Sequence, residues 1–194
     1  YFEYFNFFVF SMLLLVLSGK FLVMFFGWEL VGLSSYLLIS FWSEKKSAAR
    51  AGNKAFILNR IGDFGFLIGL MMILNEFQTF NFLRIFESSL ETIPENLDVI
   101  IVFLLLGAFG KSAQFPLFSW LPDAMEGPTP ASALIHAATM VTAGVFMLVR
   151  ISPILQFSEL GSLIIISMGL LTALIAAFAA INQKDIKKVL AYST

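Results

Sequence analysis

The chain has 194 residues, of which 59% are hydrophobic and 13% are charged, whereas a soluble domain has about 25% charged residues, so the composition excludes an ordinary soluble protein. The net charge of -1 gives no reason to expect nucleic acid as a partner, and the absence of cysteine excludes disulfides, iron–sulfur ligands and thiol chemistry within the chain. The single histidine, His136, argues against a histidine-rich metal site or a bis-histidine haem. We expect neither a metal nor a cofactor in this chain.

Long apolar runs separated by polar breaks predict an all-α, multi-pass membrane protein. A helix needs about 20 apolar residues to cross a bilayer. The sequence contains six such runs and the start of a seventh, and we interpret residues 1–194 as a single transmembrane region of a longer chain. The predicted spans are Tyr4–Gly19, Phe21–Trp42, Asn53–Leu74, Leu97–Leu121, Thr129–Val149 and Leu160–Ile181.

Lysine and arginine are unevenly divided between the two sides of these spans. Three of these residues, Lys20, Arg84 and Arg150, fall on one side, and seven fall on the other. The positive-inside rule places the richer side in the cytoplasm, or in the matrix of a mitochondrion. We therefore expect a bacterial plasma membrane, which we favour, or a mitochondrial inner membrane. The residues on the richer side are Lys45, Lys46, Arg50, Lys54, Lys184, Lys187 and Lys188.

The second span carries one formal charge, Glu29, between Lys20 and Glu44. At about 1.5 Å per residue, Glu29 lies roughly 13 Å along the helix from Lys20, near the middle of the membrane. Acidic residues at this depth usually mark ion paths. The alternative is a protonated carboxyl group that is hydrogen-bonded to a neighbouring helix.

The third span carries Arg60 and Asp63, three residues apart and therefore on one helical face. We predict a local ion pair that makes their burial tolerable and supports the site. A direct role of Asp63 in proton transfer remains the alternative.

Lys111 follows twelve uncharged residues, Val99–Gly110, and the next charge is Asp123. An ammonium group in hydrocarbon costs about 2.5–3.5 kcal/mol on insertion scales, so it needs a partner or a water-filled cavity. Pro116 lacks a backbone donor and predicts a broken helix, unless it makes only an ordinary kink. Broken backbone at this depth lines a cavity or is buried in protein, which favours a hydrated ion-handling site at Lys111.

The fifth span has polar residues at spacings of 3, 4, 3 and 3, which predicts one polar helical face directed into the bundle. We interpret its histidine as functional, with a satisfied core residue as the alternative. The polar face consists of Thr129, Ser132, His136, Thr139 and Thr142.

A separate group of charged residues near the span ends forms either a proton entrance or solvated anchors. Its members are Lys54, Asp123 and Glu126.

These residue types suit proton movement. Burial disfavours the charged form of a lysine, whereas a nearby carboxylate favours it. Making and breaking contact between Glu29 and Lys111 would therefore switch the lysine between holding and releasing a proton. Histidine titrates near neutral pH in its ordinary state, so His136 is suited to pass the proton on.

Several motifs resemble the antiporter-like membrane subunits of respiratory complex I, the subunit L/chain 5 family of NADH-quinone oxidoreductase. The resemblance extends over nearly the whole chain. It rests on Gly27-Trp28-Glu29, Asn59-Arg60-Ile61-Gly62-Asp63-Phe64, Gly110-Lys111-Ser112-Ala113-Gln114, the runs from Leu121 to Pro130 and from Ser132 to Gly144, and the run from Asp185 to Thr194.

The resemblance implies the first half of an antiporter-like fold and a proton-translocating subunit of NADH:quinone oxidoreductase. It also implies that Glu29 and Lys111 form the charged pair of a half-channel and that His136 links it toward the central axis. NAD, FMN, iron–sulfur clusters and quinone are then expected in partner subunits, with no redox chemistry in this chain. The expected partners are other membrane subunits of complex I, the bilayer and protons. An Mrp-type cation/proton antiporter subunit and a structural scaffold remain alternatives.

Overall fold

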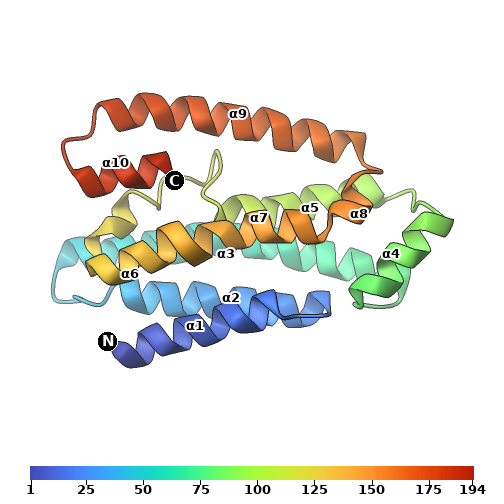
Figure 1. Cartoon of the computed structure of the whole chain (residues 1–194), viewed down its shortest axis with the longest axis horizontal. Coiled ribbons are helices and arrows are strands. Elements are labelled where there is room, and N and C mark those ends of the chain that lie inside the picture. The colour runs from blue at the N-terminus through green and yellow to red at the C-terminus, as the bar shows by residue number, and fades with distance from the viewer.

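The apolar runs form helices that lie along one common direction, as Figure 1 shows for the computed structural model. The structure describes the backbone of residues 1–194 and every side chain except those of residues 137 and 138. Within this description the fold is all-helical, which confirms the predicted class. The major helices are α1 (Phe2–Val16), α2 (Phe21–Ile39), α3 (Lys46–Phe77), α4 (Phe82–Glu91), α5 (Leu97–Lys111), α7 (Met140–Arg150), α9 (Glu159–Ile181) and α10 (Ile186–Ser193).

Four helical stretches are long and apolar enough to cross a membrane: Phe21–Ile39, Lys46–Phe77, Thr129–Arg150 and Glu159–Ile181. The shorter helices α1 and α5 lie alongside them in the bundle. Side-chain caps define several starts: the Asn81, Ser158 and Asp185 side chains accept backbone N–H groups at the first turns of α4, α9 and α10.

Helices α3 and α5 pack at very short range because glycines face each other. A Cβ atom added at Gly62 would lie 3.0 Å from the Leu106 carbonyl oxygen, and one added at Gly107 would lie 2.8 Å from the Phe66 Cβ. Small residues allow such backbone approach between membrane helices, where packing rather than water exclusion drives association. This contact positions the end of α5 against the middle of α3.

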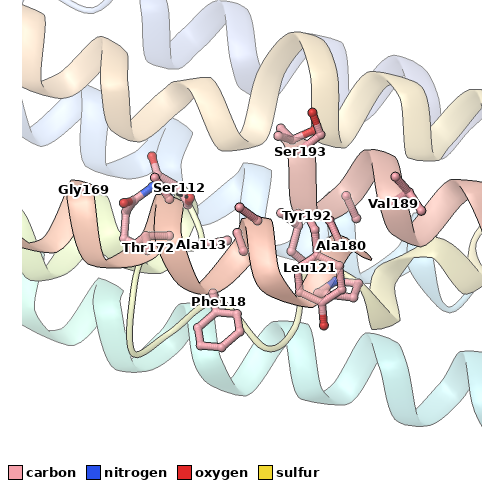
Figure 2. Close-up of a pocket in the computed structure, with 17 residues that line it drawn as sticks. Ser112, Ala113, Phe118, Leu121, Gly169, Thr172, Ala180, Val189, Tyr192 and Ser193 are labelled. Carbon is pink, nitrogen blue, oxygen red and sulfur yellow. Dashed lines mark hydrogen bonds between the residues drawn. The ribbon is translucent and has the colours of Figure 1, made fainter. Parts of the chain in front are cut away.

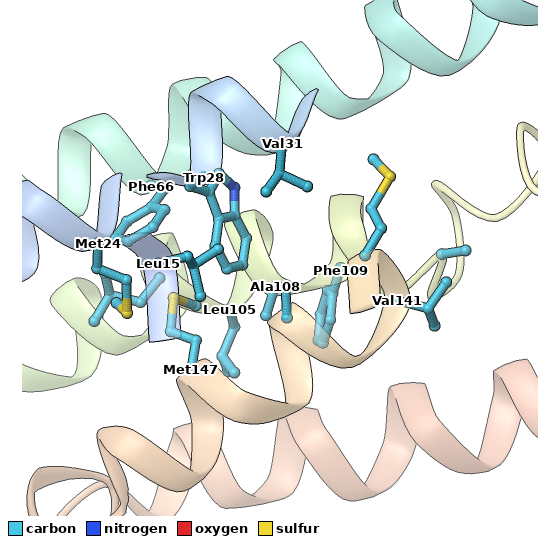
Figure 3. Close-up of a cluster of buried hydrophobic side chains, with 14 of the residues drawn as sticks. Leu15, Met24, Trp28, Val31, Phe66, Leu105, Ala108, Phe109, Val141 and Met147 are labelled. Carbon is cyan, nitrogen blue, oxygen red and sulfur yellow. The ribbon is translucent and has the colours of Figure 1, made fainter. Parts of the chain in front are cut away.

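The core lies where α1, α2, α3, α5 and α7 meet (Figure 3). Trp28 of α2 and Phe66 of α3 are both fully buried, with their rings 5.1 Å apart in an edge-to-face arrangement. Leu105 from α5 and Met147 from α7 belong to the same cluster.

The fourth predicted span, Leu97–Leu121, is helical only to Lys111. The chain then leaves the helix, and Ala113 adopts a left-handed conformation with φ of 50°. Residues 112–122 are irregular, and the 3-10 turn η1 (Asp123–Glu126) follows. The predicted break is confirmed, and it begins at Ser112, four residues before Pro116.

The fifth span contains α6 (Thr129–Ala133), the π-helical turn η2 (Leu134–Thr139) and α7 in succession. A π-turn inserts an extra residue per turn and changes which side chains share a face. Ser132 and His136 are buried, whereas Thr129 and Thr142 are exposed. The prediction of one five-residue polar face directed into the bundle is therefore wrong for its two outermost residues, Thr129 and Thr142.

The cations divide between the two ends of the bundle as the alternating topology requires. Arg150 donates to the Ser18 carbonyl oxygen, and the backbone of Lys20 forms an isolated antiparallel β-bridge with that of Asn81. These two cations therefore share one end of the bundle. Arg50, Lys54 and Lys188 line a single pocket at the other end. Which end faces the cytoplasm or matrix stays a prediction.

Helix α9 lies along one edge of the bundle, with the short α8 (Ser152–Leu155) before it and α10 folded back beneath it (Figure 1). Gly161 is its buried residue, and its leucine and isoleucine side chains are largely exposed. Together α9 and α10 leave an open space beside the irregular segment after Lys111.

Candidate functional site

Lys111 is fully buried at the last residue of α5, and its partner is Asp63 of α3. The Lys111 Nζ atom lies 3.3 Å from both carboxylate oxygens of Asp63. The Asp63 side chain is 4% exposed, so water screens this pair little. The geometry gives the ammonium group the counter-charge that its burial requires.

Helix α2 supplies the rest of this pair's surroundings. The Trp28 Nε1–H group donates to Asp63 Oδ1 at 2.7 Å, and the Lys111 Nζ atom lies 5.7 Å from the centre of the Trp28 ring. Gly32, one turn further along α2, leaves room for the ammonium group, because a Cβ atom there would lie 3.0 Å from Nζ. Neither α2 residue is among the predicted site residues, although Trp28 belongs to the Gly27-Trp28-Glu29 motif that carries the family resemblance.

Glu29 pairs with Arg60 of α3 rather than with Lys111. The Glu29 side chain is 22% exposed and the Arg60 side chain 42% exposed, and the Arg60 guanidinium lies 4.7 Å from the centre of the Phe56 ring. This second ion pair is therefore much closer to the surface of the chain than the Lys111–Asp63 pair.

The expected pairing of Arg60 with Asp63, and of Glu29 with Lys111, is thus exchanged in the structure. The reason is helical rotation. Glu29 lies about 100° around α2 from Trp28, so only one of the two adjacent residues faces α5. On α3, Arg60 and Asp63 project in directions that differ by about 60°, and each meets a different helix. Two ion pairs between helices therefore replace one predicted pair within α3 and one predicted pair between α2 and α5.

His136 lies in the π-turn and is 3% exposed. Neither Nδ1 nor Nε2 has a hydrogen-bond partner among the described residues. The ring centre of Trp120 lies 6.3 Å from that of His136. The Trp120 Nε1–H group donates to the Gly110 carbonyl oxygen at 3.1 Å. Trp120 thereby connects the surroundings of His136 with the residue before Lys111.

Ser132 and Thr139 make local contacts with the backbone of their own segment. Ser132 Oγ donates to the Gly127 carbonyl oxygen at 3.4 Å, and Thr139 Oγ1 donates to the Leu134 carbonyl oxygen at 2.6 Å. Both hydroxyl groups serve the unusual backbone around the π-turn, and neither contacts an ionisable side chain through these bonds.

The irregular segment after Lys111 is held from two sides. Ser112 Oγ donates to the Val141 carbonyl oxygen at 2.8 Å, and the Phe115 backbone N–H donates to Thr172 Oγ1 of α9 at 2.9 Å. A pocket of about 540 Å³ lies between this segment, α9 and α10 (Figure 2). Ser112, Gln114 and Thr172 contribute polar groups to its lining. The pocket thus reaches the residue next to Lys111.

The three residues considered as an entrance lie together at one end of the bundle. The Lys54 Nζ atom is 2.6 Å from Asp123 Oδ2, and Ser47 Oγ donates to Glu126 Oε2 at 3.1 Å. They line a pocket of about 170 Å³ with Arg50. Lys54 and Asp123 are both partly exposed. Their pairing fits a charged opening at a membrane surface and equally fits a pair of anchors.

Comparison with known proteins gives the family. The family model described as NADH:quinone oxidoreductase/Mrp antiporter, TM, matches residues 18–194. The chain is 53% identical to NADH-ubiquinone oxidoreductase chain 5 of Acanthamoeba castellanii, over 98% of this chain and 30% of the relative. It is 49% identical to NADH-quinone oxidoreductase subunit L of Neisseria meningitidis, over 100% of this chain and 31% of the relative.

Solved structures show the same fold. The Mrp complex from Dietzia sp. superposes on 100% of this chain and 21% of the matched chain, with a TM-score of 0.94 and 34% identity. An archaeal membrane-bound sulfane sulfur reductase matches 98% of this chain and 39% of its own, with a TM-score of 0.85 and 28% identity. The chain spans about 30% of the length of the curated relatives it matches. It is a multi-pass integral membrane protein, and it belongs to the NADH:quinone oxidoreductase/Mrp antiporter transmembrane family.

Proposed function

We propose that this chain forms part of a proton-translocating membrane subunit of NADH:quinone oxidoreductase, in which Lys111 takes up and releases the transported proton. The observation that carries this proposal is the fully buried Lys111 ammonium group, held 3.3 Å from the Asp63 carboxylate beside a second ion pair. Buried ionisable groups inside membrane helices are costly and usually functional.

The Lys111–Asp63 contact is strong enough to control a proton. At 3.3 Å and an effective dielectric constant of about 20, two unit charges attract each other by about 5 kcal/mol. Moving the carboxylate away would remove that attraction while the ammonium group stays buried, and the proton would then leave. Returning the carboxylate would favour uptake.

The Glu29–Arg60 pair supplies a means of moving that carboxylate. Arg60 and Asp63 are three residues apart on α3, close enough for an alternative contact along one helix. If Glu29 accepted a proton, Arg60 would lose its partner and would attract Asp63 away from Lys111. In this scheme the protonation of Glu29 controls how tightly Lys111 holds its proton, through Arg60 and Asp63.

His136 and the polar pocket beside the irregular segment provide the onward steps. His136 is buried and has two ring nitrogens without a partner among the described residues, so either nitrogen is available for proton exchange. Ser112 and Gln114 offer groups that can hydrogen-bond water next to Lys111. Lys54, Asp123 and Glu126 would form the entrance at the end of the bundle.

The proposed partners are the other membrane subunits of complex I, in a bacterial plasma membrane or a mitochondrial inner membrane. NAD, FMN, iron–sulfur clusters and quinone would belong to partner subunits. Their electron transfer would drive the ion-pair changes in this chain through electrostatic and conformational coupling.

The test is Lys111→Met in the full-length subunit within the intact complex. We expect proton pumping into vesicles, driven by NADH oxidation, to fall by at least tenfold while the complex still assembles. Lys45→Met removes an exposed lysine at the start of α3 and serves as the control. Pumping at wild-type coupling in the Lys111→Met complex would overturn the proposal and favour a structural scaffold.

An Mrp-type cation/proton antiporter subunit is the second candidate, favoured by the TM-score of 0.94 to the Mrp complex. The higher identity to chain 5, 53% against 34%, supports the first candidate. Vesicles that contain the full-length assembly distinguish the two. Sodium–proton exchange without NADH would favour the antiporter, and proton pumping that requires NADH and quinone would favour complex I.

A further inference from the structure

The Trp28 indole group holds the acid of the buried ion pair. Its Nε1–H group donates to Asp63 Oδ1 at 2.7 Å, shorter than a typical N–H···O bond. The acceptor is a carboxylate, and hydrogen bonds to charged groups are about twice as strong as neutral ones. Both side chains are buried, so water cannot replace the indole as donor.

Trp28 is itself held rigidly. Its ring packs edge-to-face against Phe66 at 5.1 Å, and Phe66 packs in the same way against Phe25 at 5.3 Å. Asp63 and Phe66 lie three residues apart on α3. One turn of α3 therefore makes both contacts with Trp28, the ring packing through Phe66 and the hydrogen bond through Asp63. The direction of the N–H group is therefore fixed by packing.

This arrangement selects one partner for Asp63. The carboxylate oxygen Oδ1 that accepts the indole N–H group also lies 3.3 Å from Lys111 Nζ. Any movement that carried Oδ1 away from Trp28 would break the indole bond. Gly32, on the same face of α2 as Trp28, leaves the space into which the ammonium group fits.

We propose that Trp28 is a positioning residue that fixes the Asp63 carboxylate against Lys111 and so sets how readily this ion pair opens. The inference rests on the proposed function, because it gives the opening of the Lys111–Asp63 pair a role in proton transfer. Trp28 does not carry the proton, since an indole N–H group only donates.

The experiment is a double-mutant cycle in the full-length subunit within the intact complex. It compares the wild type, Trp28→Phe, Asp63→Asn and the double variant. The readout is the initial rate of NADH-driven proton pumping, measured from about pH 6 to about pH 9. We expect Trp28→Phe to lower the rate about tenfold and to shift the pH dependence, as loss of a hydrogen bond to a charged group would. In the Asp63→Asn background the same change should lower the residual rate less than twofold. Equal factors in both backgrounds, or an unshifted pH dependence, would overturn the inference.

Phe66→Leu is the matched control, because it changes the packing around Trp28 and keeps the indole donor. We expect it to lower stability and to leave the pH dependence of pumping in place. A shift as large as that of Trp28→Phe would assign the effect to packing and would also overturn the inference.

A readout without transport separates this inference from the proposed function. The thermal unfolding midpoints of the same four purified variants should be non-additive if Trp28 acts through Asp63. Normal pumping by Lys111→Met together with non-additive midpoints would reject the proposed function and retain the Trp28–Asp63 coupling. Loss of pumping by Lys111→Met with additive midpoints would reject the role of Trp28 alone.

Discussion

The two ion pairs of this chain use the same helix, α3, yet their surroundings differ sharply. Lys111 and Asp63 are 0% and 4% exposed, whereas Arg60 and Glu29 are 42% and 22% exposed. Removing one partner of a buried pair costs about 3–5 kcal/mol, and the cost falls where the remaining charge can reach other polar groups. We therefore expect the Lys111–Asp63 pair, the inner pair, to carry the larger electrostatic energy. The Glu29–Arg60 pair, the outer pair, should rearrange at lower cost.

This difference suggests a division of labour within the proposed relay. A group that holds a proton needs a partner whose approach changes its energy greatly, as Asp63 does for Lys111. A group that responds to events elsewhere needs a pair that opens readily, which is the role that we propose for Glu29 and Arg60. The following predictions test whether burial separates the two roles.

Asp63→Asn should have the largest effect, because it leaves the buried Lys111 ammonium group without its counter-charge. We expect the free energy of unfolding of the subunit to fall by about 3 kcal/mol and pumping to fall to a small residual rate. Thermal unfolding of the purified assembly measures the first effect. Adding Lys111→Met should recover most of the stability, since it removes the uncompensated charge. A loss no larger than that of Glu29→Gln would contradict the comparison.

Gly32→Ala should have an intermediate effect. The new methyl group would lie 3.0 Å from Lys111 Nζ and 3.9 Å from Asp63 Oδ2, so the ammonium group must shift. Overpacking of this kind costs about 1–3 kcal/mol, and we expect a corresponding fall in pumping rate. Gly19→Ala is the control, because a Cβ atom at Gly19, between α1 and α2, meets nothing within 4 Å. Equal behaviour of the two variants would show that the space beside Lys111 is not restricted.

Glu29→Gln should have the smallest effect on stability and still reduce pumping. This chain encloses the outer pair less than the inner pair, so its loss should lower the free energy of unfolding by less than the fall of about 3 kcal/mol expected for Asp63→Asn. Unfolding midpoints and NADH-driven pumping, measured on the same preparations, separate the two effects. Arg60→Gln breaks the same pair from the other side and should behave alike. A stability loss comparable to that of Asp63→Asn would show that burial does not separate the pairs.

Much of the architecture could be predicted from the sequence because hydrocarbon imposes simple rules. The apolar runs predicted the helices, and their alternation predicted which lysine and arginine residues share an end of the bundle. The break after Lys111 also followed from local chemistry, since residues before a proline avoid the helical conformation. Its start at residue 112 did not, because the hydrogen bonds of Ser112 and Phe115 to distant helices fix where the chain leaves α5.

The identities of the charged residues were determined by the sequence, and their partners by the tertiary structure. Glu29, Arg60, Asp63 and Lys111 stand out because charges are rare in apolar spans, whatever the packing. Which acid meets which cation depends on the rotation of α2 and α3, since adjacent residues on a helix point about 100° apart. The sequence thus determined that charges lie within the membrane spans. Only helix packing decided that Asp63, held by Trp28, is the carboxylate that meets Lys111.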